Sequence, residues 1–282
     1  MAESIIKEIQ AKSILVPSKL PDTDYVINPY TGCAFGCSYC YASFMGRFVN
    51  KSIEAWGSYV FAKVNLPQVL ESELDRVKDK TKSVFLSSVT DPYQGVEQKY
   101  QLTRQALKLL VKYHWQGTVA ILTKSPLVTR DLDLFKQLPS IEVGLTVTST
   151  DDQVSRFFES AAPPVSLRLK ALKILHAAGI PTYAFIGPLL PHYVTSSGKL
   201  ESIFSALKDA GVKEIYIEHL NLSPYIRKRL FKKLAGSEKT VLAKFYAAGS
   251  QDYRDELNAI IKNLLKHHNF ILRGQGVIYH HH

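Results

Sequence analysis

Short apolar runs rich in β-branched residues alternate with amphipathic stretches from about residue 25 onward. Runs of this kind bounded by turn residues predict strands, and apolar positions spaced three and four apart predict helices. The predicted strands are Tyr25–Tyr30, Ser83–Ser88, Thr118–Leu122, Ile141–Thr148, Thr182–Ile186 and Glu214–Glu218. The helices predicted between them are Leu102–Tyr113, Val165–Ala178 and Ser202–Ala210.

Strands that alternate with helices predict a parallel sheet built of βα units, and therefore the α/β class. Six strands fit a partial (β/α)6 TIM-like barrel better than the full eightfold barrel. An open, doubly wound sheet fits the same pattern and stays an alternative. Both arrangements bind ligands at the carboxyl ends of the strands, so we expect the chemistry of the protein in the loops that follow them.

After Asn221 the composition changes, and a helical tail with many basic residues begins. The tail begins with the basic run Tyr225–Leu234. One or two helices are predicted over Thr240–His268, with a break near Gly249, and a strand-like run follows over Phe270–Tyr279. The sequence is therefore divided into an N-terminal extension (1–24), the barrel (25–221), a C-terminal helical extension packed on the barrel (222–279) and a purification-tag remnant (280–282).

Hydrophobic residues make up 46% and charged residues 21% of the 282-residue chain, as in ordinary globular proteins, which excludes a disordered chain. The segment Met1–Ser13 has no apolar stretch typical of a secretory signal, and no apolar run is long enough for a membrane helix. We therefore expect a cytoplasmic protein without a membrane partner. The net charge of +10 favours a polyanionic partner such as DNA or RNA.

The three cysteines, Cys33, Cys37 and Cys40, lie in the loop directly after the first predicted strand. An odd number at this spacing forms no disulfide framework and suits metal chemistry in a reducing compartment. Three thiolates on one loop can each bind one iron of a 4Fe–4S cluster, while Gly32 and Gly36 let the backbone wrap around it. The fourth iron then has no protein ligand and is open to a small molecule.

A zinc site is the alternative for the cysteine loop. Structural zinc usually has four ligands, and this loop offers three cysteines and no histidine. A distant histidine, His114, His176 or His219, would have to complete the site. The CxxxCxxC spacing in one glycine-rich loop favours the iron–sulfur cluster.

CxxxCxxC in the first loop of a βα barrel resembles the signature of the radical S-adenosylmethionine (SAM) enzymes. The resemblance implies that the open iron chelates the amino and carboxylate groups of SAM. It implies further that one-electron reduction, by a donor such as flavodoxin or ferredoxin, cleaves SAM and yields a 5′-deoxyadenosyl radical that abstracts hydrogen from a substrate. In such enzymes the cofactor performs the chemistry, and the protein orients it and excludes water and oxygen.

Five further segments are similar to the spore photoproduct lyase group, which includes proteins called DNA-repair photolyase-like. These segments are Thr90–Glu97, Leu102–Arg104, Leu122–Ser125, Thr129–Asp131 and Gly187–Pro191. The similarity covers roughly Tyr25 to Pro191. Many spore photoproduct lyases use an additional cysteine as a hydrogen donor. This chain has only the three cluster cysteines, so it departs from the group at that step and its substrate or donor must differ.

Polar residues at the strand ends are the candidates for SAM binding. By the resemblance, the loop of Thr90 and Asp91 meets the SAM amino group, although Asp91-Pro92 also suits a simple turn. Lys124, at the end of the third predicted strand, suits the SAM carboxylate or snorkels to the surface. The remaining candidates are Tyr39, next to the last cysteine, and Thr148 and Ser149, which suit the ribose hydroxyls or merely begin a loop.

A second set of polar residues has weaker claims to function. Tyr93 and Tyr183 are weak candidates for radical relays among 15 tyrosines. Glu97 suits a brace for the loop that precedes it. The Arg130-Asp131 pair is typical of a helix start, and Arg168, in the first turn of its helix, is within reach of the barrel mouth. His219 and Asn221 follow the last predicted strand.

Three functions remain open from the sequence. A radical SAM enzyme acting on nucleic acid is favoured by the resemblance, the net charge and the basic segment Arg227–Lys233, where Phe231 and the nearby Tyr225 suit base stacking. The same segment also suits a solvated helix face with Leu230 and Leu234 buried. The second hypothesis is a radical SAM enzyme that modifies a protein, peptide or small molecule, and the third is a non-catalytic metal-binding module.

Overall fold

The structure is a computed structural model that describes residues 4–280. Its strands are β1 (Ile5–Ile9), β2 (Leu15–Pro17), β3 (Tyr25–Ile27), β4 (Tyr30–Thr31), β5 (Tyr59–Lys63), β6 (Val84–Leu86), β7 (Val119–Thr123), β8 (Ile141–Thr146), β9 (Thr182–Leu189), β10 (Glu214–His219) and β11 (Ile271–Leu272). Its α-helices are α1 (Leu66–Arg76), α2 (Glu97–Tyr100), α3 (Leu102–Lys112), α4 (Leu132–Phe135), α5 (Asp152–Phe158), α6 (Val165–Ala177), α7 (Ser197–Asp209), α8 (Pro224–Lys233), α9 (Lys239–Ala247) and α10 (Gln251–His268). Its 3₁₀ helices are η1 (Tyr41–Val49), η2 (Ile53–Ala55) and η3 (Pro126–Asp131).

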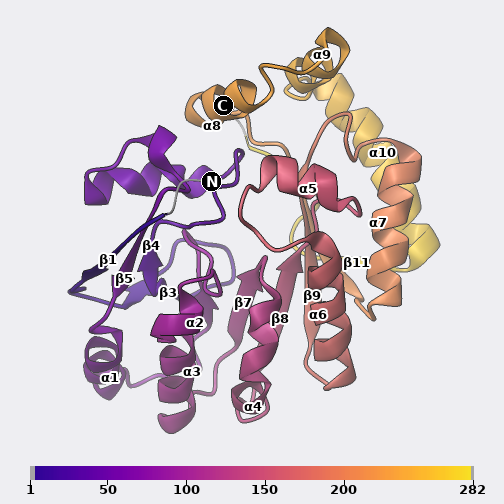
Figure 1. The fold of residues 1–282 in the computed structure, drawn as a ribbon. Helices are drawn as coiled ribbons and strands as arrows, with labels where there is room; N and C mark the ends of the chain where they lie inside the picture. Colours follow the sequence, from indigo (N-terminus) through magenta and orange to yellow (C-terminus); the bar gives the residue numbers. More distant parts are fainter. Residues whose placement is uncertain (1–3, 281–282) are drawn as a thin grey trace.

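The main sheet has the strand order β11-β10-β9-β8-β7-β6-β3-β2. Strands β3, β6, β7, β8, β9 and β10 are all parallel to their neighbours, whereas β2 is an antiparallel edge strand. All six predicted strands are present. Their order in the sheet follows the chain without reversal, which excludes the doubly wound alternative, since that fold needs a switch point. The α/β partial barrel is confirmed, with helices α3 and α6 on its outside (Figure 1).

A second sheet has three strands in the order β1-β5-β4, and the sequence pattern did not predict it. Strand β5 is a buried run, Tyr-Val-Phe-Ala-Lys, whose length does not distinguish a strand from a buried helix segment. Strand β1 pairs with β5 in parallel, and β4 pairs with β5 antiparallel. Because β4 ends at Thr31, two residues before Cys33, this sheet fixes the start of the cysteine loop.

Burial alternates along two of the barrel strands, β7 and β10. On β10, Ile215 and Ile217 are fully buried, whereas Tyr216 between them and Glu218 after them are half-buried. Such a period of two places alternate side chains on opposite faces of the sheet. The buried residues join the continuous apolar core with residues of the helices, and this burial stabilises the barrel.

The segment after residue 221 crosses the open end of the barrel and then returns to the sheet. Helices α8 and α9 lie beyond the carboxyl ends of the strands, and α10 runs beside α7 (Figure 1). The break predicted near Gly249 separates α9 from α10. Of the predicted strand-like run Phe270–Tyr279, only β11 and a bridge between Glu218 and Ile278 are extended pairings.

The histidine run at the end of the sequence is only partly described. The His280 ring bonds the Glu218 carboxylate at 2.9 Å, and residues 281 and 282 lie outside the described part of the chain. In the described residues, no helix combines the length and the apolar character that a membrane crossing requires.

The barrel interior yields a stability prediction at Gly144. A Cβ added there would lie 2.3 Å from the Tyr183 ring, which is held in place because its hydroxyl donates to the Ile121 carbonyl oxygen at 2.9 Å. Gly144→Ala should therefore reduce the free energy of unfolding by about 1–3 kcal/mol through overpacking. Urea denaturation of the variant beside the unmodified protein measures this loss of free energy of unfolding.

The control is Gly198→Ala in α7, where an added Cβ meets nothing within 4 Å. This variant should gain up to about 1 kcal/mol from helix propensity. Equal free energies of unfolding in the two variants would show that the Tyr183 ring does not pack against Gly144 of β8.

Candidate functional site

The cysteine loop is buried at the carboxyl ends of the first strands. Cys33 and Cys37 are 7% and 6% exposed, and Cys40 is half-buried. Gly32 has a φ of +90°, and a Cβ there would lie 2.5 Å from the Tyr59 carbonyl oxygen. Only glycine combines this φ with so close a backbone approach. The tight wrapping expected of the loop from its sequence is present, and β5 supplies the surface against which it turns.

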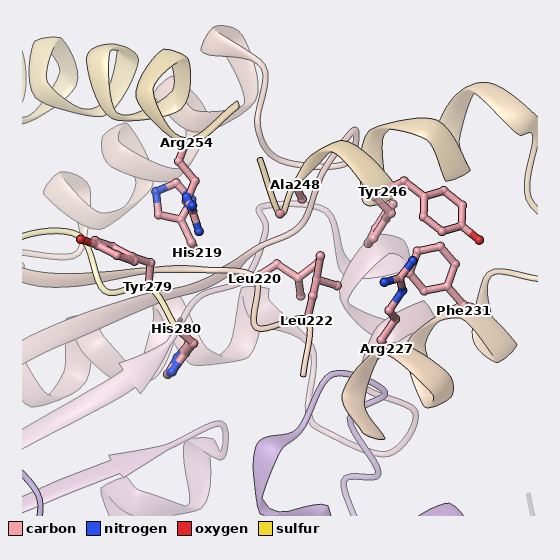
Figure 2. Close-up of a pocket in the computed structure, with 12 residues that line it drawn as sticks. His219, Leu220, Leu222, Arg227, Phe231, Tyr246, Ala248, Arg254, Tyr279 and His280 are labelled. Carbon is pink, nitrogen blue, oxygen red and sulfur yellow. The ribbon is translucent and has the colours of Figure 1, made fainter. Parts of the chain in front are cut away.

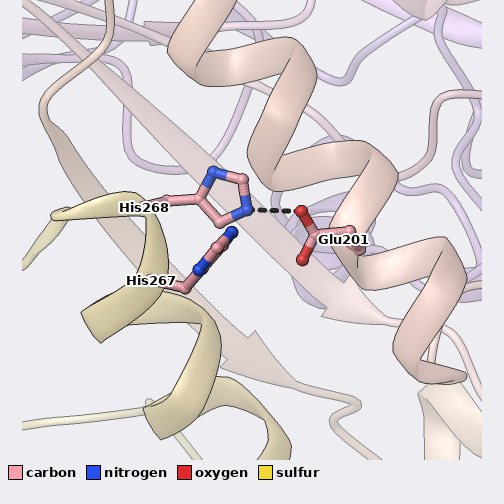
Figure 3. Close-up of side chains that lie close together, drawn as sticks. All are labelled: Glu201, His267 and His268. Carbon is pink, nitrogen blue, oxygen red and sulfur yellow. Dashed lines mark hydrogen bonds and ion pairs between the residues drawn. The ribbon is translucent and has the colours of Figure 1, made fainter.

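The spacing of the three sulfur atoms bears on the zinc alternative. Among residues 4–280, only one group of three His, Cys, Asp or Glu side chains has ligand atoms that all lie within 4.8 Å of one another, and it contains no cysteine. It consists of Glu201 on α7 with His267 and His268 on α10, where His268 bonds Glu201 at 2.6 Å (Figure 3). The sulfur atoms of Cys33, Cys37 and Cys40 therefore do not all lie within 4.8 Å of one another. A single zinc ion shared by three thiolates needs them closer together than a cluster with one cysteine on each of three irons does.

Burial makes the thiolate forms of all three cysteines costly. It raises the pKa of Cys33 well above the usual range, raises that of Cys37 to about 12 and raises that of Cys40. The positive charge of Lys124 opposes the rise at Cys37 and Cys40. Thiolates in this loop therefore need bound cations, which iron ions supply.

A group of buried polar side chains centred on Glu159 bonds the cysteine loop through Tyr39. The Glu159 carboxylate accepts hydrogen bonds from the Tyr39 hydroxyl, from the Thr148 hydroxyl at 3.1 Å and from the Arg168 guanidinium. Arg168 also donates to the Thr146 carbonyl oxygen at 3.2 Å, and the side chains of both Arg168 and Glu159 are fully buried. Tyr39, Thr148 and Arg168 from the sequence prediction thus meet around a carboxylate that the sequence did not single out.

Lys124 joins this group of polar side chains to the cysteines. Its ammonium lies 5.8 Å from the centre of the Tyr39 ring. Burial would lower the pKa of Lys124, but negative charge at Cys37 and Glu159 raises it above its ordinary value overall. A lysine that stays charged beside the cysteine loop is a suitable partner for a carboxylate or for a negatively charged cluster.

The loop after β6 braces the cysteine loop through backbone contacts. The Thr90 hydroxyl donates to the Gly32 carbonyl oxygen at 2.6 Å. Asp91 accepts hydrogen bonds from the Thr123 hydroxyl at 2.6 Å and from the backbone N–H of Lys124 at 2.8 Å. Asp91 therefore ties β6 to the end of β7, and burial raises its pKa. Contact of Thr90 and Asp91 with SAM stays a prediction.

Three other predicted residues lie in structural contacts. The Ser149 hydroxyl accepts a hydrogen bond from the backbone N–H of Asp151 at 3.0 Å, at the start of α5. The Tyr93 hydroxyl donates to Asp131 at 3.0 Å, in a buried ion-pair network that also contains Arg130. Tyr183 lies near the amino end of β9, away from the strand ends that carry the cysteine loop. The proposed relay role of the two tyrosines stays a prediction, and Arg130 forms an ion pair with Asp131 at 2.8 Å.

Helix α8, which carries the whole basic segment Arg227–Lys233, contacts the cysteine loop. Arg229 donates to the Cys37 carbonyl oxygen at 3.1 Å, and the Tyr225 hydroxyl donates to the Tyr41 carbonyl oxygen at 3.1 Å. Lys228 forms an ion pair with Glu54 at 2.8 Å. The segment is therefore more than a solvated helix face, because it covers the loop.

Beyond α8 lies a cavity of about 280 Å³ between the end of β10 and the C-terminal helices (Figure 2). The Arg227 guanidinium lies 5.6 Å from the centre of the Phe231 ring and 5.4 Å from that of Tyr246, on one side of the cavity. His219 and Arg254 line the other side (Figure 2). The His219 ring bonds Asn258 at 2.9 Å, and burial lowers the pKa of this imidazole. Cations and aromatic faces thus line one cavity near the barrel mouth.

A parallel partial barrel with three cysteines in the loop at its mouth defines a radical SAM fold. The profile of the radical SAM superfamily matches residues 27–195 of the chain. The chain therefore belongs to the radical SAM superfamily, whose members use a 4Fe–4S cluster and SAM. The match ends before α8, so the helices that cover the cysteine loop lie outside it.

The chain is also similar to several individual proteins. An uncharacterised protein, MJ0683, of Methanocaldococcus jannaschii is 40% identical over 77% of this chain and 78% of its own length. A protein of Pseudomonas phage M6 named radical SAM Nalpha-GlyT isomerase is 21% identical over 80% of this chain and 50% of its own length. A solved spore photoproduct lyase variant, with bound AdoMet and dinucleoside spore photoproduct, has a TM-score of 0.66 at 15% identity and covers 93% of this chain and 77% of its own.

The buried Glu159–Arg168 pair generates a testable contrast. Arg168→Met leaves a buried carboxylate without its cation and should reduce the free energy of unfolding by about 3–5 kcal/mol. Lys228→Met breaks the ion pair with Glu54, whose side chains are 74% and 44% exposed, and should cost less than about 1 kcal/mol.

Urea denaturation of the two metal-free variants beside the unmodified protein measures the contrast. A loss of stability in Lys228→Met as large as that in Arg168→Met would contradict the burial argument.

Proposed function

We propose that this radical SAM enzyme acts on a nucleic-acid substrate, with reducing electrons from a donor such as flavodoxin or ferredoxin. The observation that carries the proposal is the cavity lined by Arg227, Phe231, Tyr246 and Arg254 at the open end of the barrel. Guanidinium groups bind phosphates, and aromatic faces stack on bases. The net charge of +10 and the spore photoproduct lyase-like fold support the same substrate class.

The residues of the site fit the cofactors that the family uses. Cys33, Cys37 and Cys40 would hold the cluster, which when bound with SAM supplies a radical that abstracts hydrogen. Lys124 holds a positive charge beside these cysteines, in a place suited to the SAM carboxylate. Asp91 keeps the ends of β6 and β7 together, so the loops that face SAM are fixed before it binds.

Helix α8 shields the loop on the side that faces the cavity. Its Arg229 and Tyr225 bond the backbone of the cysteine loop and of Tyr41. Exclusion of water and oxygen from this face protects reactive species in the site. A substrate in the cavity would therefore approach the barrel mouth over α8.

The substrate class is tested by the SAM cleavage product. Anaerobically reconstituted, reduced protein should release 5′-deoxyadenosine from SAM, and single-stranded DNA or RNA should raise the rate several-fold. A protein with all three cysteines replaced by alanine is the control and should release none. Binding of the polymer should weaken steeply with salt, because phosphate contacts release counterions.

Two outcomes would contradict parts of the proposal. Release of 5′-deoxyadenosine that rises with a protein or small-molecule extract fraction and is indifferent to DNA and RNA would assign the enzyme to the other substrate classes. If iron-loaded, reduced protein released no 5′-deoxyadenosine, the result would contradict the proposed radical SAM activity itself.

A further inference from the structure

Helix α8 brings one arginine to the cysteine loop from 192 residues further along the chain. The Nη2 atom of Arg229 donates to the Cys37 carbonyl oxygen at 3.1 Å. The Nη1 atom of the same guanidinium is buried and has no hydrogen-bond partner among residues 4–280. A buried donor without an acceptor is costly, and a buried cation needs a negative partner nearby.

No carboxylate forms a salt bridge with Arg229 in the described part of the chain. Glu54, the acidic residue near it, is instead paired with Lys228 at 2.8 Å. The contact that Arg229 makes is with the backbone of the cysteine loop, at the Cys37 carbonyl oxygen. The loop would carry negative charge beside this guanidinium once its thiolates held a cluster.

We infer that Arg229 is a positioning residue for the iron–sulfur cluster, supplied from outside the segment that matches the radical SAM superfamily. Its Nη2 donor fixes the cysteine loop, and its Nη1 donor is left for a sulfur ligand. Its positive charge stabilises the more negative, reduced state of the cluster and so raises the reduction potential. The inference rests on the proposed cluster but concerns a residue that the family assignment does not include.

Arginine rather than lysine suits this place. The planar guanidinium donates in two directions at once, to the Cys37 carbonyl and to a second acceptor, while a lysine ammonium acts as a point charge. The two roles of Arg229 can therefore be separated. Arg229→Met removes both the charge and the donors, and Arg229→Lys keeps the charge but loses the planar pair of donors that face two directions.

The first measurement is a redox titration of the cluster followed by electron paramagnetic resonance. Arg229→Met should reduce the ratio of reduced to oxidised cluster at a fixed potential about tenfold, a shift of about 59 mV to lower potential for one electron. Lys228→Met is the matched control, because it removes the same charge from the neighbouring, exposed position of α8. Its ratio should change less than about twofold, since solvent screens exposed charges.

The second measurement is amide hydrogen exchange in the metal-free protein. Exchange in the Cys37–Tyr41 segment should be faster in Arg229→Met than in Lys228→Met, because Arg229→Met loses the hydrogen bond to Cys37. Arg229→Lys should keep the potential close to that of the unmodified protein. This variant keeps the inference testable if Arg229→Met does not fold.

Equal potentials in Arg229→Met and Lys228→Met, or unchanged exchange in Arg229→Met, would overturn the inference. Failure of the unmodified protein to take up a cluster would contradict the proposed function instead. The exchange result in metal-free protein would then still decide whether Arg229 fixes the loop, so the two failures are distinguishable.

Discussion

Three cysteine thiols in one largely buried loop impose the constraint on which the rest of the site depends. Desolvation raises the pKa of each of them, so the loop cannot carry thiolates without positive charge close by. The chain supplies Lys124 from the end of β7 and Arg229 from α8, and bound iron would supply the remainder. The buried Glu159 carboxylate, which is bonded to Arg168, accepts hydrogen bonds from Tyr39 and Thr148.

The barrel makes this arrangement possible because its parallel strands all end at one edge. Side chains that are far apart in the sequence, such as Asp91 and Lys124, meet there without long loops. The small sheet formed by β1, β5 and β4 then presents the cysteine loop to that edge. The C-terminal helices cover the same edge, so a cavity lined by arginine and aromatic side chains lies next to the loop. In this arrangement the cofactors would lie at the cysteine loop, and the substrate would lie in the cavity next to it.

Much of the barrel could be predicted from sequence because each βα unit has a local signature. The six strand positions, the ends of the predicted helices at Ala178 and Ala210 and the cysteine spacing are all local patterns. Strand β5 was missed because a short apolar run does not distinguish a strand from a buried helix segment. Strand β1 was missed because it is exposed and pairs with a strand 54 residues away.

The site could be predicted only where local position fixes it. Lys124 follows a strand, so its place at the mouth followed from the fold. Glu159 has no such signal, since its role depends on Tyr39, Thr148 and Arg168 meeting in three dimensions. Arg229 was grouped with a basic segment expected to face nucleic acid, and only tertiary structure shows it at the cysteine loop.

The central claim is that Cys33, Cys37 and Cys40 hold a 4Fe–4S cluster whose remaining iron binds SAM. The most direct measurement is the electron paramagnetic resonance spectrum of the anaerobically reduced protein, recorded before and after addition of SAM. We predict a 4Fe–4S signal whose shape changes when SAM is added, because a new ligand reaches one iron. Zinc in place of iron, or a cluster signal that SAM leaves unchanged, would contradict the claim.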